Sequence, residues 1–332
     1  MSSTAPSGPA LPQSPAGDGP VPVPARPPGR GGGRGAQSDG ARARQRRENL
    51  VAAGFIAPSL LGFGVFYFWP TLRGLYFSLT DFDFFSAPAF VGLANYQRLL
   101  EDPTFWNAMR VTLLYVAINI GVQTVLALAI AVLMHRLTQS TFVRSVVVMP
   151  YLVANVVVAL VFFWMLDAQI GIVNQALAGV GLDPVAFFGD EAWVIPTIAL
   201  VNVWRHMGYT ALLLFAGLQM IPGHLYEAAR TDGASEWRMF WSITLPLLRP
   251  VLAVVLVITM IGSFQVFDTV AVTAAGGPAD ASRVLQYYIF DLAFQRLDYG
   301  YASAVSVVLL LILMAVAVVQ LRLTRANESD LG

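Results

Sequence analysis

Residues 224–250 read HLYEAARTDGASEWRMFWSITLPLLRP, a long polar interval between two apolar segments. Residues 226–231 are helix formers, and Gly233 can supply the positive φ that ends a helix in a sharp turn. Ser235 then suits the N-cap of a second short helix, with Glu236 in its first turn. The stretch therefore predicts a bent pair of helices that is bound by a partner outside the apolar segments. The charged side chains left to pair with a partner are Glu227, Arg230, Asp232 and Arg238.

The rest of the chain has the composition of a membrane protein. Of its 332 residues, 56% are hydrophobic and only 12% are charged, well outside the usage of ordinary soluble domains. Six apolar segments are each long enough to cross about 30 Å of hydrocarbon. They run over residues 51–72, 109–134, 143–166, 192–220, 251–272 and 301–321. The sequence thus predicts an all-α membrane protein with six transmembrane helices.

Two tails flank this domain, which we place at residues 48–323. Residues 1–47 are rich in Pro, Gly and Arg, contain no aromatic residue and show no apolar periodicity, so we expect them to be disordered. Their seven arginines would suit a nucleic acid or a lipid surface, but a solvated tail that keeps the N-terminus in the cytoplasm is the simpler interpretation. We therefore expect no nucleic-acid partner. Residues 324–332 form a short second tail.

The residue types exclude most catalytic chemistry. The chain has no cysteine, so disulfides and thiolate catalysis are impossible. All twenty basic residues are arginine, so a Walker A lysine is absent and any ATP hydrolysis must come from another polypeptide. The three histidines, His135, His206 and His224, share no metal-ligand spacing. We predict no catalytic residue, no metal and no cofactor.

Arginines are distributed unevenly between the two sides of the predicted membrane domain. Residues 1–47, 135–144, 222–250 and 322–332 together hold fourteen, whereas the opposite loops hold five. Because positively charged loops stay on the cytoplasmic side, both termini and the 222–250 loop are predicted to be cytoplasmic. The absence of lysine and the Ala, Arg and Gly bias are typical of a GC-rich bacterial genome, so we expect a bacterial cell membrane.

The spacing Glu227-Ala228-Ala229, Gly233 and Ile243-x-Leu245-Pro246 resembles the EAA loop of permease subunits of binding-protein-dependent ABC importers. In that family the loop is the coupling helix that sits in a groove of the cytoplasmic ATPase. The resemblance implies a second homologous permease, an ABC ATPase dimer and an extracytoplasmic solute-binding protein as partners. It also implies that the ATPase docks on Glu227, Ala228, Ala229, Arg230, Asp232, Gly233, Ile243, Leu245 and Pro246.

Other stretches narrow the resemblance to carbohydrate importers. Residues 91–96 and 102–108 look like the stretch before the second span of carbohydrate-type permeases. Residues 267–304, which include a Gly-Gly-Pro turn, resemble the first-type permease of maltose and glycerol-3-phosphate importers. The resemblance covers about residues 50–322 and implies that the substrate is a sugar, an oligosaccharide or a polyol derivative.

Polar side chains inside the predicted spans mark a candidate substrate path, because such groups are costly in lipid and usually face the bundle interior. Arg205 lies near the middle of its segment and Asp268 near the outer end of the next, so we expect no direct ion pair between them. Gln265, Asn155 or a partner subunit are better partners for Arg205. The residues selected for the path are Asn155, Asn202, Arg205, Tyr209, Gln265 and Asp268, with Asn119, Gln123, Thr124, His206 and Ser263 as further candidates.

Two further patterns concern packing and stacking. Ala117 and Gly121 have the small-residue spacing that lets helices approach closely. Tyr151, Phe162, Trp164 and Trp204 could stack on sugar rings, although such residues more often face lipid or the membrane interface.

Other functions were weighed against the importer permease. An ABC permease for a non-sugar solute fits the same loop. An ion-coupled secondary transporter would need paired broken helices and a coupling carboxylate near the midplane, and we expect no acidic residue at that depth in any span. A membrane enzyme would need a clustered acid–base or nucleophile set, which the chain lacks.

Overall fold

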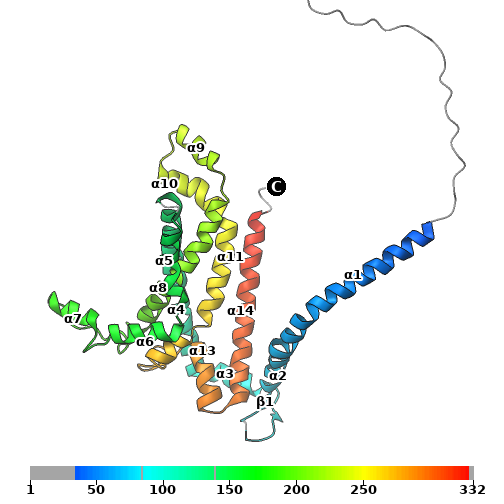
Figure 1. The fold of residues 1–332 in the computed structure, drawn as a ribbon. Coiled ribbons are helices and arrows are strands. Elements are labelled where there is room, and N and C mark those ends of the chain that lie inside the picture. The colour runs from blue at the N-terminus through cyan, green and yellow to red at the C-terminus, as the bar shows by residue number, and fades with distance from the viewer. Residues whose placement is uncertain (1–33, 84, 138–139, 329–332) are drawn as a thin grey trace, which may run out of the picture. The chain divides into compact units, whose positions relative to one another are not determined.

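The computed structural model describes residues 34–83, 85–137 and 140–328 of the chain. Most of these residues are helical, and Figure 1 labels most of the elements. Three short π-helical turns are labelled η. In chain order the elements are α1 (Arg34–Phe63), η1 (Gly64–Phe68), α2 (Trp69–Phe77), β1 (Thr80–Asp81), β2 (Ala89–Phe90), α3 (Ala94–Glu101), α4 (Pro103–Leu137), α5 (Thr141–Leu152), α6 (Asn155–Met165), α7 (Ile172–Gly179), α8 (Val194–Gln219), α9 (Gly223–Thr231), α10 (Glu236–Met239), η2 (Phe240–Thr244), α11 (Leu245–Phe264), α12 (Asp268–Thr273), α13 (Leu285–Phe290), η3 (Asp291–Gln295) and α14 (Tyr299–Glu328).

The chain divides into two compact units, Met1–Gly64 and Val65–Gly332. The tail predicted to be disordered lies outside the described residues up to residue 33, but residues 34–47 form the start of α1. Ala, Arg and Gln are strong helix formers, and adding residues to an existing helix costs far less than starting one, so the apolar part of α1 extends into them. In the same way α14 continues to Glu328, into the predicted second tail.

Five helical stretches are long and apolar enough to cross a membrane. They are Val51–Phe77, Pro103–Leu137, Val194–Gln219, Glu236–Thr273 and Tyr299–Gln320. A sixth is formed by α5 and α6 together, so all six predicted segments fall on such helices. The third segment is not one helix, however, because α5 and α6 meet at 87°. Pro150 in α5 lacks an N–H group and weakens the helix just before this break.

The second unit is a helical bundle built on α4, α8 and α11. The longest contact runs between α4 and α8, α5 packs along α8, and α11 packs against both α4 and α8. Helix α14 packs against α11 and, at its start, against α2 and α3 (Figure 1). Helices α9 and α10 lie at one end of this bundle, whereas α3, α13 and the short β1–β2 pair lie at the other.

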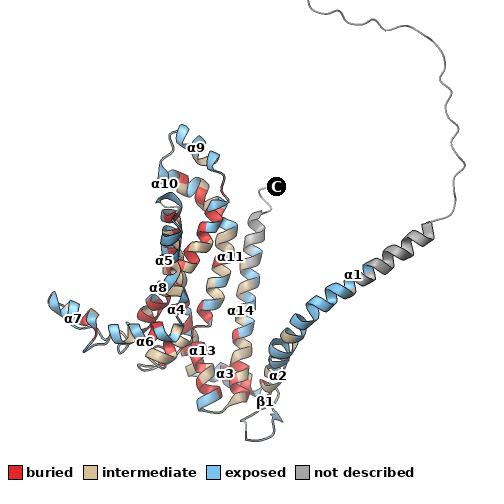
Figure 2. Cartoon of the chain, viewed as in Figure 1, coloured by how far each residue is buried: buried red, intermediate tan, exposed pale blue. Residues whose placement is uncertain are grey.

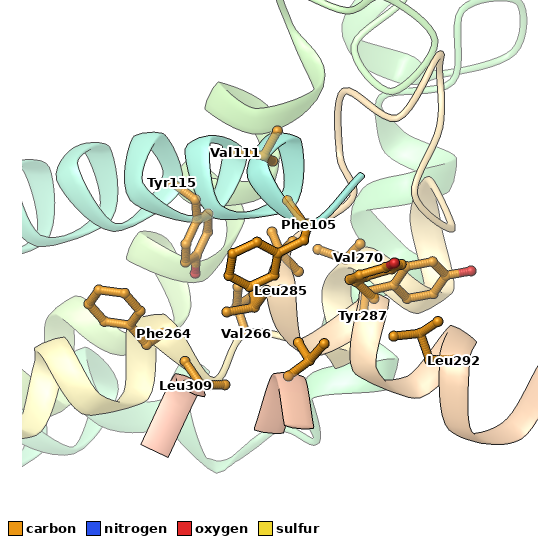
Figure 3. Close-up of a cluster of buried hydrophobic side chains, with 14 of the residues drawn as sticks. Phe105, Val111, Tyr115, Phe264, Val266, Val270, Leu285, Tyr287, Leu292 and Leu309 are labelled. Carbon is orange, nitrogen blue, oxygen red and sulfur yellow. The ribbon is translucent and has the colours of Figure 1, made fainter. Parts of the chain in front are cut away.

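Buried side chains form two clusters, one toward each end of the bundle (Figure 2). The first joins the start of α4 and α8 to α13 and α14, with Phe105, Tyr288 and Tyr301 almost fully buried (Figure 3). The second joins the later turns of α4 and α8 to α11, around Leu214 and Leu248. Helices α4, α8 and α11 carry residues of both clusters. The space between the clusters therefore has the same three helices as its rigid walls.

Glycines set the closest helix contacts. A Cβ atom added at Gly208 of α8 would lie 1.8 Å from the carbonyl oxygen of Val147 in α5, so the two backbones nearly touch there. A Cβ at Gly217 would meet Leu248 at 2.9 Å. The close approach expected at Gly121 is absent within the described part of this chain, where no atom lies within 4 Å of such a Cβ.

Candidate functional site

The 222–250 loop has the bent helix pair that its residues predict. Helix α9 ends at Thr231, and Gly233 has a φ of +76°, the left-handed conformation that glycine tolerates best. The Ser235 hydroxyl accepts a hydrogen bond from the backbone N–H of Arg238 at 3.3 Å, which makes Ser235 the N-cap of α10. Pro246 lies in the first turn of α11, where its missing N–H costs nothing.

The predicted docking residues divide into two groups by exposure. Glu227, Ala228, Arg230, Asp232 and Gly233 are exposed on α9 and the bend that follows it. The side chains of Glu227 and Asp232 form no ion pair with the described residues. The other four, Ala229, Ile243, Leu245 and Pro246, are partly buried and pack the loop onto the bundle. The unpaired carboxylates of Glu227 and Asp232 are therefore exposed on a helix pair that packs against the bundle.

Glu236 ties this loop to the end of α4. Its carboxylate lies 2.7 Å from Arg136 Nη1 and 3.3 Å from Arg230 Nη2. A hydrogen bond of 2.9 Å between the hydroxyls of Tyr226 and Thr244 closes the other side of the loop. Between these contacts lies a pocket of about 470 Å³.

A second cavity, of about 250 Å³, lies between the two buried clusters, and we call it the central cavity. Its walls come from α4, α5, α6, α8 and α11 and from residues 265–269. All six residues selected for the substrate path line it, and so do four of the five further candidates. Thr124 is the exception among the candidates. Tyr115, Thr210, Thr259 and Thr269, which were not among the predicted path residues, also line the cavity. Thr210 lies one helical turn beyond His206, on the same face, which could have indicated it.

Arg205 reaches the break between α5 and α6. Its Nε donates to the carbonyl oxygen of Val153 at 3.0 Å, and its Nη2 donates to that of Tyr151 at 3.2 Å. The last carbonyls of a helix have no intrahelical donor, and a cation is favourable beside them. Gln265 and Asn155, the partners expected for Arg205, do not hold it, because the helix break supplies these carbonyls instead.

Asp268, at the start of α12, faces α6 across the cavity wall. Its Oδ2 accepts a hydrogen bond from Asn155 Nδ2 at 3.0 Å, and no ion pair joins it to Arg205 in the described part of the chain. The absence of a direct pair was expected. Asp268 and Arg205 nevertheless line the same cavity, because the turn at 265–267 between α11 and α12 brings Asp268 to it.

Buried amides connect the helices that surround the cavity. Asn119 Nδ2 donates to Ser263 Oγ at 2.9 Å, and Gln123 Nε2 donates to Thr210 Oγ1 at 2.8 Å. Asn202 Nδ2 donates to Thr269 Oγ1 at 3.1 Å. These bonds join α4 to α11, α4 to α8 and α8 to α12. They fix the relative positions of the cavity walls and satisfy groups that would be costly if left unpaired.

Aromatic rings form one side of the central cavity. Tyr151 and Tyr209 are stacked, with ring centroids 4.5 Å apart and planes inclined by 12°. Of the four aromatic residues weighed for stacking on sugars, Tyr151 alone lines this cavity. Trp164 and Trp204 are exposed on the bundle surface, as residues that face lipid would be.

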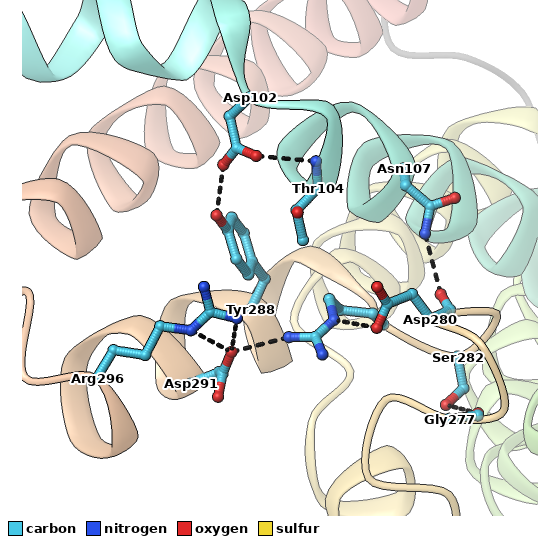
Figure 4. Close-up of polar contacts among 10 residues, drawn as sticks. Asp102, Thr104, Asn107, Gly277, Asp280, Ser282, Tyr288, Asp291 and Arg296 are labelled. Carbon is cyan, nitrogen blue, oxygen red and sulfur yellow. Dashed lines mark hydrogen bonds and ion pairs between the residues drawn. The ribbon is translucent and has the colours of Figure 1, made fainter.

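At the opposite end of the bundle, Asp102 just before α4 is hydrogen-bonded to Tyr288 of α13 (Figure 4). Asp102 accepts hydrogen bonds from the hydroxyls of Tyr288 and Tyr301, the second at 2.7 Å. Burial raises the pKa of the Asp102 carboxyl, but these hydrogen bonds and two from backbone N–H groups outweigh burial and hold its pKa below the usual value. Asp291 accepts from Arg283 at 2.8 Å and from Arg296 at 3.0 Å. This end is therefore firmly cross-linked.

Known proteins are similar to this chain in sequence and fold. The family described as "Binding-protein-dependent transport system inner membrane component" matches residues 123–329. The trehalose/maltose transport system permease protein MalF of Thermococcus litoralis is 34% identical over 281 residues, 84% of this chain and 95% of that protein. The sulfoquinovosyl glycerol transport system permease protein SmoG of Agrobacterium fabrum is 32% identical over 284 residues, 85% of this chain and 92% of that protein.

A solved structure agrees in fold. A chain from the crystal structure of a bacterial ABC transporter involved in the import of the acidic polysaccharide alginate superposes with a TM-score of 0.77. The match covers 86% of this chain and 99% of that one, at 23% identity, and so shows the fold alone. The family match and the two relatives go further: this chain belongs to the binding-protein-dependent transport system inner membrane components, a family of transport permeases and not of enzymes.

Proposed function

We propose that this chain is the permease subunit of an ABC importer and forms the translocation path for a sugar or a sugar derivative. The observation that carries the proposal is the central cavity, in which all six path residues selected from the sequence come together. These residues lie on α6, α8 and α12 and in the turn before α12. The named substrates of the two relatives, trehalose or maltose and sulfoquinovosyl glycerol, support a carbohydrate.

The 222–250 loop is the proposed docking site for a separate cytoplasmic ATPase dimer. Its exposed side chains Glu227 and Asp232 have no ion-pair partner within the described chain and suit a partner with basic groups. The loop continues directly from α8 and into α11, and both helices line the central cavity. Closure of the ATPases would therefore move two cavity walls together.

The remaining partners follow from the same proposal. A second homologous permease completes the channel, and a solute-binding protein delivers the substrate at the end of the bundle that carries α3 and α13. Both termini and the 222–250 loop are proposed to lie in the cytoplasm, and the arginine distribution supports this orientation.

The test is purification from detergent-solubilised native membranes with this chain as bait, followed by reconstitution of the recovered complex into vesicles. We expect a second permease, an ATPase and a binding protein in the complex, and sugar uptake that requires ATP. Because Asp268 lies in the cavity, the assay includes an arm with proton and sodium ionophores and no ATP. Uptake that needs no ATP and is abolished by the ionophores would refute the importer and favour the ion-coupled alternative. ATP-driven uptake of a non-sugar solute would refute the substrate class alone.

A further inference from the structure

The pocket of about 470 Å³ beneath the 222–250 loop shares no lining residue with the central cavity. Its walls are the last turns of α4 and α8, helix α9 and single residues of α10 and η2, at the end of the bundle where α9 and α10 lie (Figure 1). Its volume is typical of small-molecule sites, which measure about 300–1,000 Å³. The charged side chains of its lining decide which kind of molecule fits.

Two arginines of this pocket hold one carboxylate between them. Arg136, in the last turn of α4, places Nη1 2.7 Å from Glu236 Oε2. Arg230, in the last turn of α9, places Nη2 3.3 Å from Oε1 of the same group. Cations from two different helices therefore converge on one anion position at the pocket wall.

These cations have most of their hydrogen-bonding capacity left. A guanidinium carries five N–H groups, whereas Arg136 and Arg230 each reach Glu236 through a single nitrogen and have no other hydrogen bond or ion pair with the described residues. His135 also lines the pocket, and its ring nitrogens form no hydrogen bond with that part of the chain. The pocket can thus donate to an anion that has more oxygen atoms than a carboxylate.

Glu236 can be displaced from this position. The side chains of Arg136, Glu236 and Arg230 are 35%, 52% and 61% exposed, and ion pairs at such exposure add little stability. A phosphate monoester has up to two negative charges and three strong acceptor oxygens, and arginine binds it through two parallel N–H bonds. Such a group therefore competes well with Glu236 for both arginines.

The rest of the lining suits a molecule with hydroxyl groups. The Glu227 carboxylate lines the pocket without an ion-pair partner among the described residues, so it can accept O–H donors and would repel a second anionic group. The hydroxyls of Tyr226 and Thr244, 2.9 Å apart, also line the pocket and can each form a further bond. A fitting ligand thus carries its negative charge at one end and hydroxyl groups at the other.

We propose that the pocket beneath the 222–250 loop binds a phosphate ester with hydroxyl groups, whose phosphate replaces Glu236 on Arg136 and Arg230. This chemistry has two sources, a soluble sugar phosphate and the head group of phosphatidylglycerol, because basic pockets between spans on the cytoplasmic side also take lipid head groups. Binding unties α4 from the loop and so lowers the amount transported per ATP hydrolysed. This effect rests on the proposed function, whereas the site itself does not.

The first experiment measures binding to the complex of permeases and ATPases in nanodiscs, which leave both membrane faces accessible. Discs of phosphatidylcholine are titrated with glucose-6-phosphate in a calorimeter, without nucleotide. We expect binding in the wild type and an affinity at least about tenfold lower in Arg136→Gln, which loses hydrogen bonds to a charged group.

Arg238→Gln is the matched control for this titration. Arg238 is exposed in the same loop but does not line the pocket, so the affinity of this variant should stay within about twofold of the wild type. The affinity for ATP, measured separately, shows that each variant complex is intact. No binding in the wild type, or an equal loss in the two variants, would overturn the proposal.

A second titration distinguishes the two sources of the ligand. In discs that contain phosphatidylglycerol, an unchanged affinity for glucose-6-phosphate assigns the pocket to a soluble ester. A fall in affinity that the wild type shows and Arg136→Gln does not assigns the pocket to the lipid head group, which then competes with the ester.

Uptake then tests the effect on transport, in vesicles with the binding protein outside and ATP inside, with or without glucose-6-phosphate. At a concentration equal to its Kd the ester occupies half of the pockets, so the amount transported per ATP should fall by up to about twofold in the wild type. In Arg136→Gln, adding the ester should cause no further change. An unchanged ratio in a wild type that binds the ester would overturn the regulatory effect and leave the proposed function standing. Binding through Arg136 in a complex without ATP-driven uptake would overturn the proposed function and leave the site standing.

Discussion

The contact between Gly208 and α5 allows a sharp prediction for Gly208→Ala. A Cβ at this position would lie 1.8 Å from Val147 O, whereas close carbon–oxygen contacts in proteins are about 3.3 Å, so α5 must retreat by roughly 1.5 Å. Arg205 lies one turn earlier on the same face of α8, and its bonds of 3.0 and 3.2 Å to the end of α5 would be stretched beyond hydrogen-bonding distance.

Two opposing effects decide how much Gly208→Ala changes the free energy of unfolding. Alanine is preferred over glycine in a helix interior by about 1 kcal/mol. Overpacking costs about 1–3 kcal/mol, and loss of one hydrogen bond to a charged group costs about 1.5 kcal/mol or more. We therefore expect Gly208→Ala to lower the free energy of unfolding by roughly 2–3 kcal/mol, against the helix preference.

The assay is thermal unfolding of the purified chain in detergent, followed by tryptophan fluorescence. At about 2 °C per kcal/mol for a chain of this size, Tm should fall by roughly 4–6 °C. Gly121→Ala in α4 is the matched control, because an added Cβ there meets nothing within 4 Å, and its Tm should stay level or rise. Equal Tm values for the two variants would refute the close contact between α5 and α8.

Three further predictions concern the two ends of the bundle. Gly233→Ala should abolish most ATP-driven uptake without changing membrane insertion, because a left-handed φ of +76° costs a residue with a side chain roughly 1–2 kcal/mol. The control is Gly223→Ala, because Gly223 has open space around it and no positive φ. Equal uptake by the two variants would contradict the role of the bend. Glu236→Arg and Arg136→Glu should each lower the amount transported per ATP hydrolysed, because each breaks the ion pair between the two residues. The double variant should recover part of this coupling. A double variant that transports less per ATP than either single variant would argue against the ion pair. Because the pKa of Asp102 is lowered in the fold, its stabilisation is present above the usual value of 3.8 and is lost as the pH falls through the folded value. Asp102→Asn should therefore lower Tm at pH 7, and the gap to the wild type should narrow as the pH falls below 3.8; a gap that stays constant as the pH falls below 3.8 would rule this out.

The bend in the 222–250 loop could be predicted because its causes are local. Gly233 adopts a positive φ, Ser235 caps the N–H of the residue three positions later, and Pro246 lacks an N–H group. Each of these effects can be recognised within one helical turn of sequence. The six spans were predictable for a similar reason, since hydrocarbon thickness alone sets their length.

The predicted path residues lie together in one cavity, because polar groups in an apolar span must face the interior. Asn155, Asn202 and Arg205 do so, and they line the central cavity. What they bind there could not be predicted. Side chains from one helix meet acceptors from another, and the pairing depends on the relative rotation and depth of both.

The depth estimate for Asp268 was made for an unbroken helix. A rise of about 1.5 Å per residue applies only to such a helix, and it argued against a direct ion pair of Asp268 with Arg205 while both remained candidates for the same path. The chain leaves the helix at residue 265 and begins a new one at Asp268, and the α5–α6 break bends the facing span by 87°.

The residues at that break, Leu152 to Asn155, include no glycine or proline, and Pro150 is the only local signal. The carbonyls exposed there are satisfied by Arg205, which lies 52 residues beyond Val153. A break that depends on so distant a donor is stable only when the bundle is assembled, so the folding of this cavity and the placement of its charges are one event.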